Sequence, residues 1–193
     1  SPVCAPSRSS IITGMYPTTL GTQNMRSYKK FENEKINKNN QLPFYSAVPK
    51  KDSQFFTEIL RSNGYYCTNN SKEDYNMLMS PLAWDESNIT AHWRNRKENQ
   101  PFFAVFNFST THESELWRNK MKFTKNEINS IQLPSVFPDN YIIKKDFLTN
   151  YKNIELLDKK IGEIIQQLKE DGLYDNTIIF FYSDHGGPFP RYK

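Results

Sequence analysis

Continuous runs of apolar residues predict the strands of a buried sheet. Residues 102–108 and 177–182 are almost wholly apolar, which is typical of strands covered on both faces. A shorter run of the same kind, residues 65–68, predicts a third strand. Each run leads directly into polar residues, so these strands are expected to carry polar side chains at their carboxyl ends.

Apolar residues at helical spacing predict three helices. The first covers Pro6 to Thr13 with Gly14 as its stop, and the second follows a Ser53 cap and ends at Gly64. Strands that alternate with helices indicate an α/β sandwich. The apolar face of the third and longest helix consists of Ile154, Leu157, Ile161, Ile164, Ile165 and Leu168.

The composition fits one globular domain. At 193 residues the chain can bury a single sizeable core, and its net charge of +4 comes from lysines dispersed among asparagines and glutamates. This dispersal gives no support to nucleic-acid binding, and no run approaches the ~20 apolar residues that span a membrane. Two cysteines do not make a disulfide framework, and Cys67 is expected to be a lone buried thiol.

A nucleophile stands at the start of the first predicted helix, in the string C-A-P-S-R that begins at Cys4. Pro6 fits the first helical position, where its missing N–H costs nothing. The free backbone N–H groups of this turn, together with the Arg8 guanidinium, would suit a bound oxyanion. A buried cysteine with a purely structural role is equally compatible with these residues, so the chemistry alone leaves both interpretations open.

Polar residues with metal-binding capacity follow the apolar run 177–182, in the string D-H-G-G that begins at Asp184. A carboxylate and an imidazole at a strand end can both bind a cation, although an aspartate there is as often a turn former or helix cap. His112 ends the other long apolar run, in a polar context that is usually found on the surface.

The string C-x-P-S-R at Cys4, followed five residues later by Thr13 and Gly14, resembles the signature of the type I sulfatases. These are formylglycine-dependent enzymes of the alkaline phosphatase-like superfamily, and the blocks around His112 and Asp184 follow in the family's order. The resemblance implies an α/β, alkaline phosphatase-like sandwich with a central mixed, largely parallel sheet flanked by helices. It also implies that a formylglycine-generating or sulfatase-maturating enzyme oxidises Cys4 to Cα-formylglycine.

The resemblance further implies a role for each site residue, with Ca²⁺ as the expected ion and Mg²⁺ as the alternative. His112 would protonate the leaving oxygen, whereas His92 matches no family position and is interpreted as structural. Asp74 stands where the family usually has a histidine, which leaves the general base open. The implied metal ligands are Cys4, Asp184 and His185. The implied catalytic residues are Cys4, Arg8, Lys72, His112 and Lys193.

The implied function is hydrolysis of sulfate esters, or of an N-sulfate, on a sulfated carbohydrate, in the periplasm or outside a bacterial cell. Residues 64–72 and 187–190 resemble bacterial sulfatases near the heparan N-sulfatase group. Two enzymatic or binding alternatives remain, a phosphonate or phosphate-ester hydrolase of the same superfamily and an inactive sulfoglycan-binding relative. A third is an α/β domain whose cysteine is structural.

The sequence opens on Ser1 without a methionine. Family members begin with a strand ending in paired aspartates, which supply two further metal ligands. We therefore expect residues 1–193 to be an internal fragment of a sulfatase N-terminal catalytic domain. The expected fragment lacks that first strand with its aspartates and the C-terminal part of the domain, and is inactive by itself.

Overall fold

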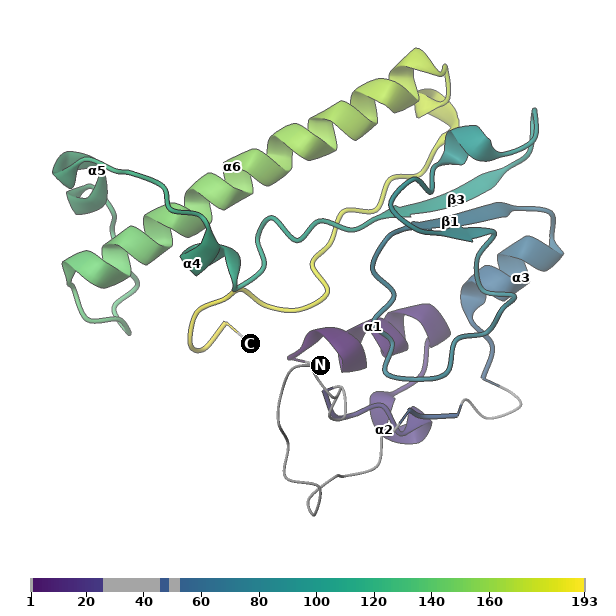
Figure 1. Ribbon diagram of the computed structural model, residues 1–193, viewed down its shortest axis with the longest axis horizontal. Helices are drawn as coiled ribbons and strands as arrows, with labels where there is room; N and C mark the ends of the chain where they lie inside the picture. Colours follow the sequence, from purple (N-terminus) through teal and green to yellow (C-terminus); the bar gives the residue numbers. More distant parts are fainter. Residues whose placement is uncertain (1, 26–45, 49–52, 193) are drawn as a thin grey trace, which may run out of the picture. The chain divides into compact units, whose positions relative to one another are not determined.

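The computed structural model describes residues 2–25, 46–48 and 53–192. Most of the predicted loop 21–50 lies outside these ranges. The chain divides into two compact units, which are described separately (Figure 1). The first unit comprises Ser1–Asn107 and Ser183–Gly186, and the second comprises Phe108–Tyr182 and Gly187–Lys193.

The first unit contains a small parallel sheet of three strands in the order β2-β1-β3. Strand β1 (Tyr66–Asn70) pairs with β3 (Phe102–Phe106) in register from Tyr66 opposite Phe102 to Asn70 opposite Phe106. Both strands confirm the two apolar runs that predicted them. The short strand β2 (Glu86–Ser87) consists of two polar residues, so no apolar run marks it in the sequence.

Helix α1 (Cys4–Thr13) begins two residues before the predicted start, and Cys4 is its first residue. Pro6 is therefore the third helical residue, not the first, and its missing N–H still costs nothing because it lies in the first turn. The predicted stop is confirmed, since Gly14 has φ +69° and its N–H donates to Ser10 O at 2.7 Å. A one-turn helix, α2 (Pro17–Leu20), follows.

Helix α3 (Phe56–Ser62) packs beside β1, and Figure 1 shows it next to the sheet. The predicted Ser53 cap is wrong, because Phe55 occupies the N-cap position and no side chain caps this helix. The Phe55 side chain is only 1% exposed, and its burial in the core stabilises the helix start where no capping hydrogen bond forms. The core of the unit consists of Ile12, Leu20, Ala47, Phe55, Cys67, Tyr75, Met77, Ala83 and Trp84.

An aromatic cluster packs against strand β3. Trp93, in the short helix η2 (Trp93–Asn95), is 2% exposed and packs against Phe102 and Phe106 with ring centroids 5.9 and 5.5 Å apart. His92 lies against Trp93, and its Nδ1 accepts a hydrogen bond from the Arg94 N–H. These contacts agree with a structural role for His92.

The second unit is built around helix α6 (Tyr141–Glu170), which is longer than its apolar spacing predicts. It begins earlier because the Asn140 side chain caps it, accepting from Ile143 N–H at 3.0 Å. Its N-terminal half carries the buried Phe147, whose ring stacks on that of Phe189 with centroids 3.9 Å apart. The short helices α4 (Glu115–Arg118) and α5 (Lys125–Asn129) contact α6.

The predicted strand at residues 177–182 does not form in the structure. After the short helix η3 (Tyr174–Asn176) this segment belongs to no strand, and Ile178, Phe180 and Phe181 are 82%, 76% and 74% exposed. A strand needs a neighbour to take its backbone hydrogen bonds, and all the strands among the described residues belong to the first unit. The apolar pattern of residues 177–182 therefore predicts a strand, but it does not show whether a neighbouring strand is present to pair with it.

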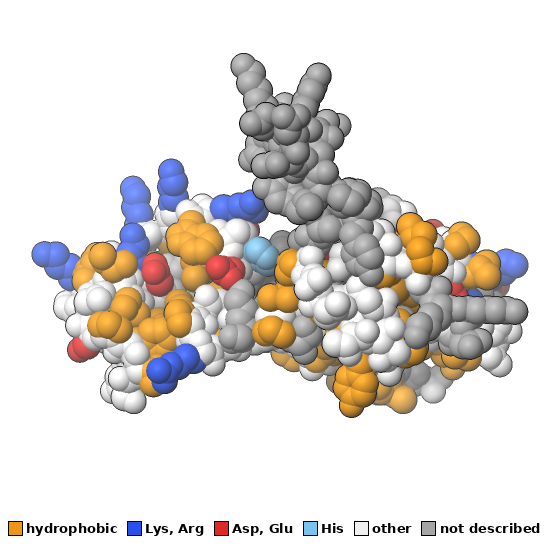
Figure 2. All heavy atoms as spheres, turned by 90° about the horizontal axis from the view of Figure 1, so that it is seen from below, with side chains coloured by type: hydrophobic (Ala, Val, Ile, Leu, Met, Phe, Trp, Pro, Cys, Tyr) orange, Lys and Arg blue, Asp and Glu red, His pale blue; other side chains and the backbone are white. Residues whose placement is uncertain are grey.

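The surface of the second unit is basic around α4 and α5. Exposed side chains there include Arg118, Lys120, Lys122 and Lys125, and Figure 2 shows several basic side chains projecting from this region. In the described ranges no helix combines the length and the apolar character that crossing a bilayer requires.

The buried thiol of Cys67 gives a first prediction. Burial, and secondarily the Asp85 charge, raises the pKa of Cys67 to about 12, whereas an unfolded thiol titrates near ~8.5. The unfolded state then binds fewer protons than the folded state, so the stability contribution is complete below about pH 8.5 and is lost as the pH rises toward 12. Tyr66 acts in the same direction, because burial and Glu86 raise its pKa.

Urea unfolding measured between pH 8 and 11 would test this coupling. We expect the free energy of unfolding to fall with pH, and to fall less steeply in Cys67→Ala, which removes one of the two groups. In the native protein iodoacetamide should leave Cys67 unmodified at pH 8. Equal slopes for both proteins, or ready alkylation of native Cys67, would contradict the prediction.

Candidate functional site

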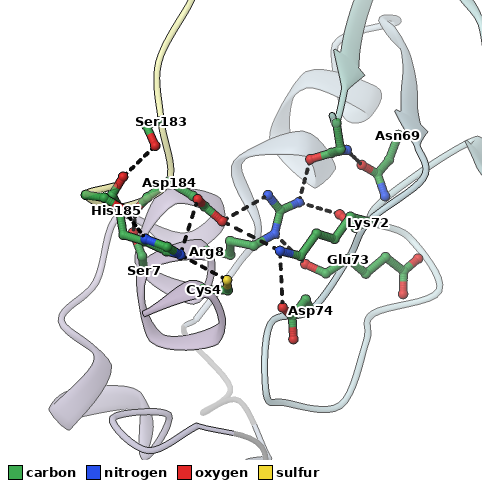
Figure 3. A network of polar contacts seen from close by, with 12 residues as sticks. Cys4, Ser7, Arg8, Asn69, Lys72, Glu73, Asp74, Ser183, Asp184 and His185 are labelled. Carbon is green, nitrogen blue, oxygen red and sulfur yellow. Dashed lines mark hydrogen bonds and ion pairs between the residues drawn. The ribbon is translucent and has the colours of Figure 1, made fainter. Parts of the chain in front are cut away.

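The first turn of α1 meets the segment Ser183–Gly186 within the first unit. Cys4 Sγ lies 3.1 Å from His185 Nε2, and the Ser7 hydroxyl donates a hydrogen bond to the carbonyl of Asp184 (Figure 3). Cys4 is buried, and the side chains of Asp184 and His185 are 23% and 15% exposed. Three residues that the sequence singled out from opposite ends of the chain are therefore neighbours.

The orientation of the His185 ring is fixed by the backbone of the next residue, Gly186. Its Nδ1 lies 2.7 Å from the carbonyl oxygen of Gly186. Because a carbonyl oxygen only accepts, Nδ1 carries the hydrogen and donates it. In the neutral ring Nε2 then holds a lone pair, and this is the nitrogen that faces Cys4 Sγ.

Two cations flank the carboxylate of Asp184. Its Oδ2 lies 3.9 Å from Arg8 Nη1 and 3.8 Å from Lys72 Nζ, while its Oδ1 lies 3.8 Å from His185 Nε2. Lys72 also lies 3.6 Å from the buried carboxylate of Asp74. One oxygen of Asp184 is thus directed at the two cations and the other at His185, as Figure 3 shows.

The Arg8 guanidinium holds the loop that leaves β1. Its Nε donates to Glu73 O at 3.0 Å, and its Nη2 donates to Lys72 O and, at 2.8 Å, to Asn107 Oδ1. The guanidinium also lies 5.8 Å from the ring centre of Tyr75. These contacts place Arg8 as the group that positions Lys72. Its predicted contact with a substrate oxyanion stays a prediction.

A chain of amides and hydroxyls supports this arrangement at the carboxyl ends of the strands. Asn107 Nδ2 donates to Asn69 Oδ1 at 2.8 Å, and Asn69 Nδ2 donates to Ser87 Oγ at 2.9 Å. Ser87 in turn donates to the Glu73 carboxylate at 2.6 Å. Sequence reasoning missed Asn69 and Asn107, although their place at the ends of two apolar strands was the available signal.

Cys4, Asp184 and His185 each offer one ligand atom, and these atoms all lie within 4.8 Å of one another. The set comprises one sulfur, one nitrogen and one carboxylate. Calcium takes 6–8 oxygen ligands, so these three groups do not fit calcium while Cys4 remains a thiol. Within the described ranges Asp184 is the cluster's only carboxylate.

The catalytic roles predicted for His112 and Lys193 stay predictions. His112 lies in the second unit on an exposed turn, where its Nδ1 accepts from the Ser114 N–H at 3.2 Å. The Nε2 of a neutral His112 therefore carries the hydrogen. Lys193 lies outside the described residues.

Comparison with known proteins gives a consistent family. The family model described as sulfatase matches residues 49–191. An ulvan-active sulfatase of Formosa agariphila is 41% identical over 228 residues, which cover 100% of this chain and 37% of that protein. A second ulvan-active sulfatase of this bacterium is 26% identical, covering 96% and 42%, and arylsulfatase K of Bos taurus is 20% identical, covering 96% and 44%. The chain spans less than half the length of these relatives.

The contacts of Arg8 predict a large loss of stability on its removal. Arg8→Ala should lower the free energy of unfolding by about 2–4 kcal/mol, because buried carbonyl acceptors lose a charged donor. Arg8→Lys keeps the charge but cannot form the fork of N–H groups, so it should recover only part of the loss.

Urea unfolding, with hydrogen exchange of residues 72–75, measures both effects. The control is Arg118→Ala, which removes a 75% exposed side chain and its ion pair with Glu115 and should cost less than about 1 kcal/mol. An Arg8→Lys protein with wild-type stability and exchange would show that the guanidinium fork does not hold the loop.

Proposed function

Because the chain belongs to the sulfatase family, we propose that this protein hydrolyses sulfate esters of a sulfated carbohydrate. The observation that carries the proposal is the position of Cys4 Sγ, 3.1 Å from His185 Nε2 and at the start of α1. A nucleophile within hydrogen-bond distance of a base, beside Lys72 and Arg8, suits attack on a charged ester. Two relatives whose names specify activity on ulvan support a carbohydrate substrate.

Cys4 is the proposed site of the formylglycine modification, made by a formylglycine-generating or sulfatase-maturating enzyme. The aldehyde supplies, in its hydrated form, the hydroxyl that attacks sulfur. Support comes from the family and from the string C-A-P-S-R, in which Pro6, Ser7 and Arg8 all have structural roles in α1 or its contacts.

His185 is the proposed general base. Its Nδ1–H is donated to Gly186 O, so the Nε2 lone pair, which faces Cys4, is the one that can accept a proton. This assignment fills the role that sequence reasoning left open at Asp74. Asp74 is instead paired with Lys72, where its charge holds the ammonium in place.

Lys72 is the proposed contact for the sulfate oxygens. Its side chain is 36% exposed. Its Nζ lies 3.8 Å from the Asp184 carboxylate and 3.6 Å from that of Asp74, which is too far for a hydrogen bond to either. Charge on the sulfate oxygens would attract the ammonium, while Arg8 keeps the Lys72 backbone fixed. Lys193 has the same proposed role, on the resemblance alone.

His112 is the proposed acid for the leaving oxygen. Its Nδ1 accepts a hydrogen bond from the Ser114 N–H, which leaves Nε2–H as the donor, and the side chain is exposed. This role rests on the family resemblance and on that tautomer.

Calcium is the ion that the resemblance implies, with Asp184 as its carboxylate ligand and the oxygen that replaces Cys4 sulfur as a second donor. Calcium needs 6–8 oxygen ligands, and the described residues of the cluster do not provide them. Within the described residues the geometry therefore supports nucleophile, base and cations, and no proposed step depends on the ion. O-sulfate and N-sulfate substrates both remain compatible with this arrangement.

The first functional prediction concerns Cys4. Protein coexpressed with a maturation enzyme should show the aldehyde mass at Cys4 and should cleave an aryl sulfate. Cys4→Ala should abolish both, because the nucleophile is removed. The matched control is Cys67→Ala, which removes the other, fully buried cysteine and should keep the modification and the activity.

Three outcomes would contradict the proposal. An unmodified Cys4 without turnover would favour a sulfoglycan-binding relative. Faster cleavage of an aryl phosphonate than of an aryl sulfate would favour a phosphonate hydrolase. Full activity of Cys4→Ala would favour a structural cysteine.

The second functional prediction concerns His185. His185→Gln should lower kcat by about 10²–10⁴-fold, as expected for loss of a general base. It should also remove the acidic limb of the pH–rate profile, since the group that must be deprotonated is gone. His92→Gln is the control that changes a histidine outside the site, and should keep the pH profile. A His185→Gln enzyme that retains the acidic limb would show that another group is the base.

A further inference from the structure

The unoxidised site offers a donor set different from the one that the mature enzyme would use. Before modification, the cluster consists of the Cys4 sulfur, the His185 Nε2 nitrogen and the Asp184 carboxylate. Thiolate and imidazole are the donors that zinc prefers among divalent ions of biology. We propose that the protein with unmodified Cys4 binds Zn²⁺ through Cys4, His185 and Asp184.

The spacing of the ligand atoms is close to that of a tetrahedral zinc site. With Zn–S near 2.3 Å and Zn–N and Zn–O near 2.0–2.1 Å, tetrahedral angles require S···N about 3.6 Å and N···O about 3.4 Å. The observed distances are 3.1 Å from Sγ to Nε2 and 3.8 Å from Nε2 to Asp184 Oδ1. The third pair, Sγ and the carboxylate oxygen, lies within 4.8 Å, so binding requires the side chains to rotate toward a common centre.

A second observation that supports the zinc site is the hydrogen bond made by the other ring nitrogen of His185, Nδ1. A histidine that binds a metal usually donates its other ring N–H to a carbonyl or carboxylate, which fixes the tautomer and aims the lone pair. His185 makes this contact through Nδ1 to Gly186 O at 2.7 Å. The nitrogen that remains is Nε2, which already faces Cys4 and Asp184.

Asp184 is oriented in the same way. Its Oδ2 faces Arg8 and Lys72, while its Oδ1 faces His185 Nε2. The two cations orient the carboxylate through Oδ2, which leaves Oδ1 as the oxygen for the metal. Three protein ligands leave one position of a tetrahedron for water, the coordination found in catalytic zinc sites.

Binding forms a Zn–S bond and releases the thiol proton of Cys4 to solvent. Oxidation of Cys4 to the aldehyde would remove the sulfur donor and put oxygen in its place. The site would then prefer a harder cation, since oxygen donors suit calcium and magnesium. Modification of one residue would in this way change which metal the protein binds.

The test uses the intact protein produced without a maturation enzyme, so that Cys4 stays a thiol. Titration with CoCl₂ should give an intense near-ultraviolet absorption from thiolate bound to cobalt, saturating at one equivalent, and ZnCl₂ should abolish it by displacement. Cys4→Ser should lack this absorption. The control Cys67→Ala should retain it, because Cys67 is fully buried away from the cluster.

The ligands other than sulfur are tested by affinity. His185→Gln and Asp184→Asn should each weaken Zn²⁺ binding by at least about 10-fold, measured by competition with a chromophoric chelator. An absorption that persists in Cys4→Ser would overturn the proposal. Zn²⁺ affinity unchanged in His185→Gln, or no cobalt–thiolate absorption at all, would also overturn it.

The proposal goes beyond the proposed hydrolysis and needs only the thiol form of Cys4. The two can fail separately. If the matured enzyme is active but its thiol form does not bind Zn²⁺, only the zinc site is refuted. A thiol form that binds Zn²⁺ beside a matured form without sulfatase activity would refute only the hydrolysis.

Discussion

The arrangement of the site depends on one partly buried guanidinium. Arg8 projects from α1 and donates to the carbonyls of Lys72 and Glu73 and to the amide of Asn107. A planar fork of N–H groups can satisfy acceptors from separate segments at once, which an ammonium cannot do with the same geometry. The loop after β1, the residue after β3 and the first helix are thereby joined at one point. Because Cys4 lies on that helix, the contacts of Arg8 also set where the nucleophile stands.

The two oxygens of the Asp184 carboxylate face different groups. Arg8 and Lys72 approach Asp184 from the side of Oδ2, whereas His185, which contacts Cys4, lies on the side of Oδ1. A carboxylate with both oxygens paired to cations would have little attraction left for a further ligand. The observed arrangement keeps one oxygen fixed and leaves the other for chemistry.

Much of the site could be predicted from sequence, because its residues stand in short strings at element ends. Cys4 begins a helix, and Asp184 and His185 follow an apolar run, so local pattern and the family resemblance together singled them out, and their roles stay predictions. Contacts that depend on the folded chain could not be predicted this way. The backbone carbonyls that receive the Arg8 hydrogen bonds have no sequence signature, and Asn107 is one of many asparagines. The apolar run 177–182 predicted a strand, yet strand formation requires a partner that pattern alone does not reveal. The start of α6 was missed because a single asparagine cap, Asn140, decides it.

The parallel sheet has a consequence for how this protein can change. All three strands run in one direction, so Asn69, Ser87 and Asn107 lie at the same edge, at or just beyond the ends of their strands. The strands themselves are fixed by packing against Phe55, Trp84 and Trp93 on their faces. The residues that pack on the faces of the strands therefore differ from the polar residues at the strand ends. Selection for a new substrate can replace the residues beyond the strand ends while the pairing of β1 with β3 is inherited unchanged.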